Sequence, residues 1–167
     1  MKFILPTINN KKDVLDFYLE FENNNETCIG YADHNDYDKW LSQMENRKNN
    51  INLPKGYVKE NFYLCYERNK LVGVFSLKFE LTDYLFNYGG HIGYAVRPSL
   101  RNQGFATIIL KEGLKIAKQY EFNKLLLVVD DDNLPSIKVV LKNNGIYENS
   151  LYDNEEKVNV NRYWINL

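Results

Sequence analysis

Hydrophobic positions along the chain follow two periods, one typical of helices and one typical of strands. Apolar residues recur at every third or fourth position in residues 11–22, 37–47, 104–117 and 133–143, which predicts four helices. Runs rich in aromatic and β-branched residues predict seven strands, at residues 3–5, 61–67, 71–79, 89–96, 124–129, 146–152 and 157–165. The asparagine-rich segment 49–59, which also holds Pro54 and Gly56, is predicted to be a loop.

The run from Lys124 to Val129 is apolar without alternation, which predicts a strand buried on both faces, as a central parallel strand is. Together with the strand at 89–96 and the helix between them, it predicts a right-handed β-α-β unit. Gly145 follows the last helix and is expected to be its left-handed C-cap. The whole order of elements, β-α-α-β-β-β-α-β-α-β-β, predicts a mixed α/β fold in one domain spanning residues 1–167.

Composition and charge narrow the possible partners. A formal net charge of −1, with both signs interspersed, gives no basic surface for nucleic acid. The longest apolar run is far shorter than a membrane span and the first apolar run is too short for a signal peptide, so no membrane partner is expected. Cys28 and Cys65 form no paired motif, which favours a reducing, cytoplasmic setting.

The segment from Arg101 to Ala106 (Arg-Asn-Gln-Gly-Phe-Ala) has the features of an anion site. It follows a strand that Pro98 ends, and it leads into the amphipathic helix that begins near Gly104. A glycine lets the backbone approach a ligand closely, and the first N–H groups of a helix have no internal partner and lie at the positive end of its dipole. These properties predict a phosphate-binding loop.

The pattern Arg-x-x-Gly-x-Ala after a strand resembles the pyrophosphate loop of the GNAT superfamily of acyl-coenzyme A dependent N-acyltransferases. The order of elements matches that family from end to end, and Gly-His-Ile-Gly-Tyr-Ala-Val-Arg-Pro followed by Asp-Asp-Asp-Asn looks like a bacterial subgroup of predicted acetyltransferases. The resemblance implies a mixed central sheet of about six to seven strands flanked by about four helices. It also implies acetyl-coenzyme A as co-substrate and a small-molecule or peptide amine as acceptor, in a monomer or homodimer.

The resemblance also implies which residues bind the cofactor. Loop N–H groups would hold the pyrophosphate, the end of the strand would pair with the pantetheine arm, and residues after the buried strand would reach the pantetheine chain and the thiol. Asn133 suits a helix N-cap as well, and both roles can coexist. The expected cofactor-binding residues are Tyr94, Ala95, Val96, Arg101, Asn102, Gln103, Gly104, Phe105, Ala106, Thr107, Asn133 and Ser136.

The family's usual acid is missing from this chain. Many GNAT enzymes have a tyrosine about seven residues after the asparagine, where this chain has Val140. A thiol pKa of about 8.5 makes departure as thiolate cost roughly 2 kcal/mol at neutral pH, so transfer is slowed without being forbidden. Tyr94 and Tyr147 are the candidates to replace the missing hydroxyl.

A primary amine acceptor with a pKa of about 10.4 must also lose a proton before it attacks. His91 is a candidate base, because its ordinary pKa suits proton acceptance, and the alternative is a structural histidine at the start of a strand. Glu80, which would act through a water, is the second candidate. Asp130, Asp131 and Asp132 are interpreted as favourable charge near a helix N-terminus.

Other chemistries fit the sequence poorly. Gly89 to Gly93 precedes a strand and lacks dinucleotide-binding spacing, and no nucleoside-triphosphate loop is present. His34 lies among acidic residues whose spacing matches no zinc or calcium motif, so no metal is expected and the segment is interpreted as a loop that caps the second helix. The resemblance to the GNAT superfamily therefore implies an N-acetyltransferase that acts directly on a primary amine, with a non-catalytic acyl-coenzyme A binding domain as the alternative.

Overall fold

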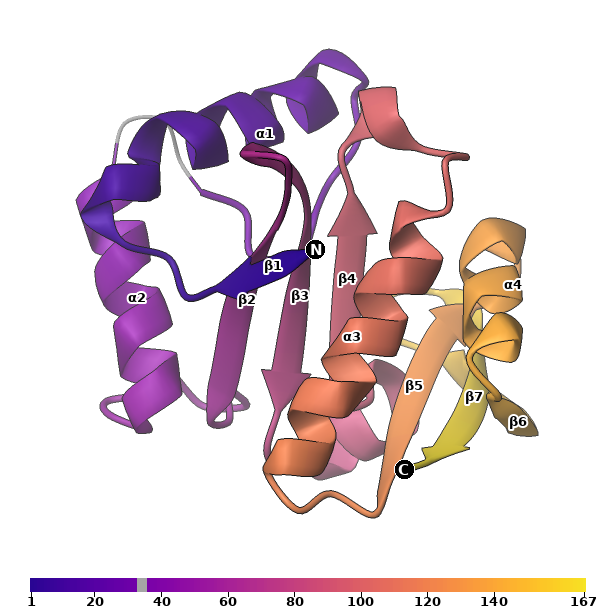
Figure 1. The fold of residues 1–167 in the computed structure, drawn as a ribbon. Coiled ribbons are helices and arrows are strands. Elements are labelled where there is room, and N and C mark those ends of the chain that lie inside the picture. The colour runs from indigo at the N-terminus through magenta and orange to yellow at the C-terminus, as the bar shows by residue number, and fades with distance from the viewer. Residues whose placement is uncertain (33–35) are drawn as a thin grey trace.

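The computed structural model describes residues 1–32 and 36–167 and contains seven strands and four α-helices (Figure 1). The helices are α1 (Lys11–Asn23), α2 (Tyr37–Asn49), α3 (Phe105–Gln119) and α4 (Leu134–Lys142). The strands are β1 (Lys2–Ile4), β2 (Glu60–Glu67), β3 (Lys70–Lys78), β4 (Ile92–Val96), β5 (Lys124–Asp130), β6 (Ile146–Asp153) and β7 (Val158–Asn166). The predicted α/β class and order of elements are confirmed. No helix among the described residues is long and apolar enough to cross a membrane.

The strands form two sheets instead of one continuous sheet. The first sheet has the order β1-β2-β3-β4 and the second has the order β5-β7-β6, and every ladder between these strands is antiparallel. The predicted β-α-β unit is present, because β4 and β5 point the same way with α3 between them in the chain (Figure 1). The expected parallel ladder is absent from the described residues: β5 pairs with β7, and it is hydrogen-bonded to the chain before β4 only at Gly90 and His91, which face Leu127 and Leu126.

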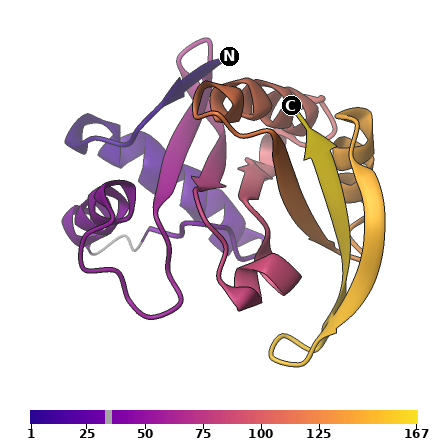
Figure 2. The same cartoon turned by 90° about the horizontal axis from the view of Figure 1, so that it is seen from below.

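Helices cover both faces of the first sheet (Figure 2). On one face, α1 and α2 bury a cluster that includes Phe17, Trp40 and Leu64. On the opposite face, α3 packs a second cluster that joins the two sheets and includes Phe75 and Ile109. This arrangement leaves the N-terminal ends of α3 and α4 at the same end of the molecule as the end of β4 (Figure 1).

The helix α3 approaches the first sheet closely because Gly113 faces β3. A Cβ atom at Gly113 would lie 2.3 Å from the ring of Phe75, a separation at which a side chain would have to move. Ile109 approaches Gly73 from the helix side in the same way, at 2.5 Å from a Cβ built there. These small residues fix the height of α3 above the sheet and so place its N-terminus relative to β4.

Two local predictions need correction. Residues 85–89 form a single π-helical turn and β4 starts only at Ile92, because the chain turns sharply at Gly90, which has φ 68°. The left-handed residue after α4 is Asn144 (φ 64°) and not Gly145. Gly145 is required for space instead, since a Cβ there would lie 2.3 Å from a methyl group of Val140.

Candidate active site

The two sheets separate between β4 and β5, and the point where they still touch is His91. The backbone N–H of His91 donates to the carbonyl of Leu126 at 2.8 Å, and the N–H of Leu126 donates to Nδ1 of the imidazole at 2.9 Å. Beyond this joint β4 is paired only with β3 among the described strands, and β4 and β5 diverge (Figure 1). One edge of Tyr94, Ala95 and Val96 therefore lacks a neighbouring strand, and this is the edge expected to meet an extended amide ligand.

The loop before α3 has the geometry of an anion cradle. Asn102 (φ 61°) and Gly104 (φ 82°) both have left-handed backbones, which turns successive N–H groups toward one side. Within the described part of the chain, the N–H groups of residues 102–107 donate to no protein acceptor. A Cβ on Gly104 would have no atom within 4 Å, so the space beside this glycine is open. Such a cradle can hold an anion.

The side chain of Arg101, which was predicted to bind the cofactor, is already bonded to other residues of the protein. Its Nη1 donates to Oε1 of Glu26 at 2.8 Å, its Nη2 donates to Oε2 of the same carboxylate, and its guanidinium lies over the ring of Phe21. The hydrogen bonds from Arg101 lower the pKa of the Glu26 carboxyl. Arg101 thus ties the loop to the segment after α1, and the charge that it offers to an anion at the rim is partly balanced.

Tyr94 and Ser136 bridge the gap between β4 and α4. Their hydroxyl groups lie 2.7 Å apart and are hydrogen-bonded. Burial raises the pKa of Tyr94 to about 12, so its hydroxyl stays protonated at neutral pH. The structure therefore brings Tyr94 to Ser136, the residue expected to line the thiol, whereas Tyr147 lies on β6 with its exposed hydroxyl near Ser150.

Asn133 caps α4, because its side-chain oxygen accepts a hydrogen bond from the N–H of Ser136 at 3.2 Å. Replacing Asn133 with alanine is expected to lower the free energy of unfolding by about 1 kcal/mol, the usual effect of losing such a cap. Asn133→Asp keeps the cap and serves as control. Coenzyme A titrations on both variants separate the two roles: if Asn133 also binds pantetheine, the alanine variant loses affinity beyond what its stability explains.

His91 has the geometry of the structural alternative. Its Nδ1 accepts from the Leu126 N–H, and its ring packs at 5.6 Å from Phe122 and 6.5 Å from Trp164. Burial lowers the pKa of His91 to about 4. Neutral imidazole has one accepting nitrogen, and here that nitrogen is already engaged by a backbone N–H that no substrate amine can replace without opening the joint.

His91→Ala is expected to lower the melting temperature while the pH profile of kcat from pH 6 to 9 keeps its shape, because a group with a pKa of about 4 does not titrate there. His91→Asn, whose side-chain oxygen can accept from Leu126, is expected to recover part of the stability. As pH falls from 6.5 toward 4 the unfolded chain takes up the proton first, so the wild type loses stability in this window and both variants lose less. A kcat profile whose acid limb vanishes in both variants would instead assign His91 as the base.

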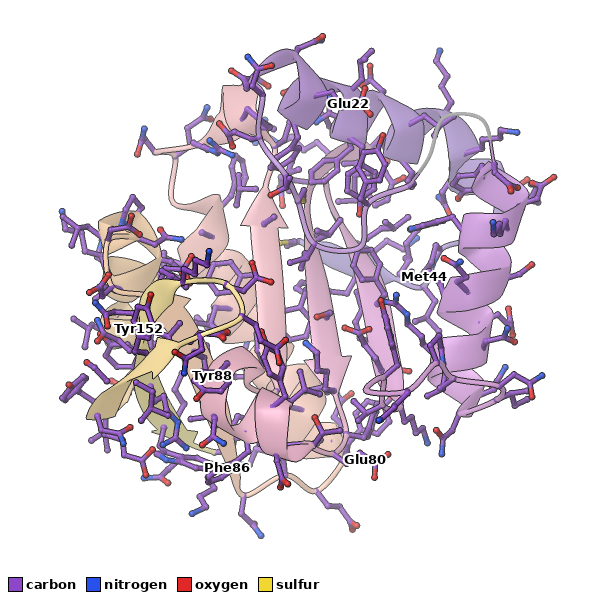
Figure 3. All side chains as sticks on the ribbon, turned by 180° about the vertical axis from the view of Figure 1, so that it is seen from behind. Glu22, Met44, Glu80, Phe86, Tyr88 and Tyr152 are labelled. Atoms are coloured by element: carbon purple, nitrogen blue, oxygen red, sulfur yellow. The ribbon has the colours of Figure 1, made fainter. Side chains whose placement is uncertain are left out.

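Glu80 is the remaining predicted catalytic residue, and Val140 stands where the family usually has a tyrosine. Glu80 is exposed just beyond the end of β3, at the lower edge of the back face (Figure 3), and has no hydrogen bond or ion pair with any described residue. Val140 is fully buried in the core and packs against the chain at Gly145. Val140, at the position where many GNAT enzymes have a tyrosine, is therefore a residue of the hydrophobic core in this chain.

A cavity of about 520 Å³ opens on the face of the first sheet that α2 partly covers. It reaches β4, because two of its lining residues, Ile29 and Ser76, lie 3.2 and 3.1 Å from the Cβ position of Gly93. Met44 borders it from α2 (Figure 3). Its charged residues, Arg47, Glu60 and Lys78, were not among the predicted site residues. The sequence did hold a signal for this cluster: Glu60 and Lys78 are charged residues on a strand face whose other positions are buried, where apolar residues are expected.

Possible metal ligands give no site in the part of the chain that the structure covers. No group of three or more His, Cys, Asp or Glu side chains gathers there. His34, with its neighbours Asp33 and Asn35, lies outside the described residues. Asp36 caps α2 by accepting from the N–H of Lys39 at 3.2 Å, as the loop interpretation of this segment requires.

Known proteins share this fold. An acetyltransferase that modifies the N-terminal serine of a 50S ribosomal protein from Salmonella typhimurium is 17% identical with a TM-score of 0.73, over 99% of this chain and 94% of that one. The microcin C7 self-immunity acetyltransferase MccE, in complex with acetyl-CoA and AMP, is 17% identical with a TM-score of 0.72, over 99% of this chain and 91% of that one. A spermidine N-acetyltransferase SpeG variant from Vibrio cholerae is 15% identical (TM-score 0.67; 99% and 95% covered).

Sequence comparisons give the family directly. A search of curated proteins finds no match. The sequence pattern of the acetyltransferase (GNAT) family, by contrast, matches residues 31–146, which include the loop before α3, the diverging strands and both helix N-termini at the gap. The chain belongs to the GNAT family of acetyltransferases.

Proposed function

We propose that this protein transfers the acetyl group of acetyl-coenzyme A directly to a primary amine that occupies the cavity beside β4. The observation that carries the proposal is the convergence at one gap of an anion cradle, an unpaired strand edge and a buried, protonated tyrosine. A cavity large enough for a small acceptor, or for the end of a peptide, reaches the same strand at Gly93. The cradle suits the pyrophosphate, the strand edge suits the pantetheine arm, the tyrosine suits the departing sulfur and the cavity suits the acceptor amine.

In the proposed complex, the N–H groups of residues 102–107 bind the pyrophosphate and the free edge of β4 pairs with the pantetheine arm. The exposed N–H and C=O groups of β4 hold the thioester where its carbonyl oxygen meets a backbone N–H. A preorganised donor at that place stabilises the charge that develops on the oxygen as the amine attacks. Ser136 and Asn133, at the start of α4, border the sulfur end of the arm.

In the transfer itself the substrate amine is the nucleophile. Its nitrogen forms a bond to the acetyl carbon, the carbon–sulfur bond breaks, and the departing thiolate takes a proton from the hydroxyl of Tyr94. The amine gives its proton to water in the cavity, and this water returns a proton to the oxygen of Tyr94 as the tyrosine donates its own, so that no phenolate accumulates and Tyr94 ends the cycle protonated. Neither cysteine serves as a covalent carrier, because burial raises the pKa of Cys28 to about 12 and raises that of Cys65 as well, which keeps both as thiols.

Measurement of free thiol release tests the proposal. Acetyl-coenzyme A is incubated with the protein and a panel of amines, amino acids, peptides and aminoglycosides, and release above the protein-free background supports transfer. Thermal unfolding with coenzyme A measures binding separately, because a ligand bound only to the folded state raises the melting temperature. Binding without thiol release for the whole panel would favour a non-catalytic acyl-coenzyme A binding domain, an alternative that the core position of Val140 supports.

We place this activity in the cytoplasm. The two free cysteines support a reducing compartment, since both are at least partly buried and no disulfide joins them. Fractionation of cells that express the protein from its own start site, followed by immunodetection, tests the location. Recovery in a membrane or secreted fraction would contradict it.

A further inference from the structure

Three charged side chains meet at one end of the cavity. Nη1 of Arg47, on α2, donates to Oε2 of Glu60 at 3.1 Å, and Nζ of Lys78 lies 3.8 Å from Oε1 of the same carboxylate. Glu60 and Lys78 come from adjacent strands, where they face each other in the register of β2 and β3. A single carboxylate is therefore shared by two cations.

Among the described residues, this cluster joins two basic side chains to a single carboxylate, and burial lowers the pKa of the Lys78 ammonium. The side chains of Arg47 and Lys78 are each 20% exposed and that of Glu60 is 9% exposed, so water screens them only partly. The ring of Tyr57 lies 4.6 Å from the Arg47 guanidinium and holds it on the cavity wall. Among the described lining residues these three are the only charged ones. Partly buried charges normally have partners, so a second anion is favoured here.

The cluster lies at a defined distance from the predicted reaction centre. Ser76 faces Gly93 across β3 and β4, and Lys78 follows two residues further along the same strand and the same face. Two residues of strand span roughly 7 Å. A molecule whose amine lies near Gly93 can thus reach the cluster with a second group that is several bonds away from the amine.

We propose that the acceptor is a primary amine that also carries an anionic group, a carboxylate or a phosphate, and that Arg47 and Lys78 bind this group. The inference rests on the proposed function, because it takes the cavity as the acceptor site. A guanidinium and an ammonium on one wall are the usual partners of both anions. The same wall repels a second ammonium group, so polyamines are poor acceptors of this protein.

Three acceptors of equal length test the charge preference: 5-aminopentanoate, its neutral amide 5-aminopentanamide, and 1,5-diaminopentane. We expect the wild-type kcat/KM for the carboxylate to exceed that for the amide at least tenfold, with the diamine poorest. The pair 4-aminobutyl phosphate and 4-aminobutanol repeats the comparison and tells phosphate from carboxylate. Equal kcat/KM values for charged and neutral members of both sets would overturn the inference while leaving acetyl transfer intact.

Variants of the cluster assign the preference to named residues. The measured quantity is the ratio of kcat/KM for 5-aminopentanoate to kcat/KM for 5-aminopentanamide. Lys78→Met is expected to reduce this ratio at least fivefold, and Lys78→Arg is expected to leave it unchanged. Glu60→Gln, which removes the shared carboxylate, is expected to raise the ratio. Lys118→Met on the exposed side of α3 is the matched control and should change nothing. A ratio unaltered by Lys78→Met, in protein whose circular dichroism melt shows it folded, would contradict the proposal.

A binding experiment separates this inference from the proposed function. Glutarate is titrated calorimetrically into the protein saturated with coenzyme A, so that the loop before α3 is already filled. We expect one site whose Kd rises at least tenfold in Lys78→Met and falls in Glu60→Gln. Glutarate binding that depends on Lys78, in a protein that acetylates no amine, would contradict the proposed transfer reaction and support the anion site. Acetylation of amines by a protein that does not bind glutarate would contradict the anion site and support the transfer reaction.

Discussion

Replacing Gly104 with valine is expected to raise the Kd for coenzyme A at least 100-fold. The glycine has φ 82° and open space where a Cβ would be, at the start of the helix whose first N–H groups are proposed to bind the pyrophosphate. A branched side chain would fill the space that the pyrophosphate needs. Calorimetric titration with coenzyme A measures the affinity, and the rise in melting temperature that the ligand causes should disappear with it.

Gly56→Val is the matched control for this experiment. Gly56 also has a left-handed backbone, with φ 89° and no atom within 4 Å of a Cβ, but it lies in the loop between α2 and β2. Both substitutions carry the conformational cost of a side chain at positive φ, about 1–2 kcal/mol, which corresponds to a loss of about 2–8 °C in melting temperature. Equal losses of coenzyme A affinity in the two variants would contradict the loop assignment.

Tyr94→Phe is expected to lower kcat about 10- to 30-fold with little change in the Kd for coenzyme A. The variant must release a thiolate, and the pKa of about 8.5 makes this cost roughly 2 kcal/mol at neutral pH. Because the pKa of Tyr94 is raised to about 12, the wild-type hydroxyl is protonated throughout pH 6 to 10. The ratio of wild-type to variant kcat should therefore be largest near neutral pH and fall as the pH rises past about 8.5, where the thiolate is itself the stable form.

Two further variants separate catalysis from packing at Tyr94. Ser136→Ala removes the hydrogen bond between the two hydroxyl groups but keeps the 3.3 Å bond from Tyr94 to the Ser136 carbonyl, so it should lower the free energy of unfolding by about 1 kcal/mol or less while it keeps the Tyr94 hydroxyl and most of kcat. Tyr147→Phe removes an exposed hydroxyl on β6 and should leave kcat unchanged. An unchanged kcat in Tyr94→Phe, or the same loss in Tyr147→Phe, would rule out Tyr94 as the acid.

The features that the sequence predicted well depend on short-range interactions. The period of apolar residues along α3 and the aromatic runs of β2 and β3 each place one side of an element in the core, and the predicted bounds agree with the structure within a few residues. The cap at Asn133 and the glycine at the start of α3 are likewise decided by a few neighbouring residues. At Gly145 the predicted left-handed C-cap was wrong, and the close packing against Val140 is what requires a glycine there.

The sequence by itself thus determined the elements, their order and the loop before α3. The tertiary structure decided the separation of β4 from β5, the pairing of Arg101 with Glu26 and the hydrogen bond from Leu126 to His91. It also brought Arg47 to Glu60 and Lys78 on the cavity wall. Periodicity records which face of an element is buried, but not which distant residue meets it, and a charge or an imidazole acquires its role only from that neighbour.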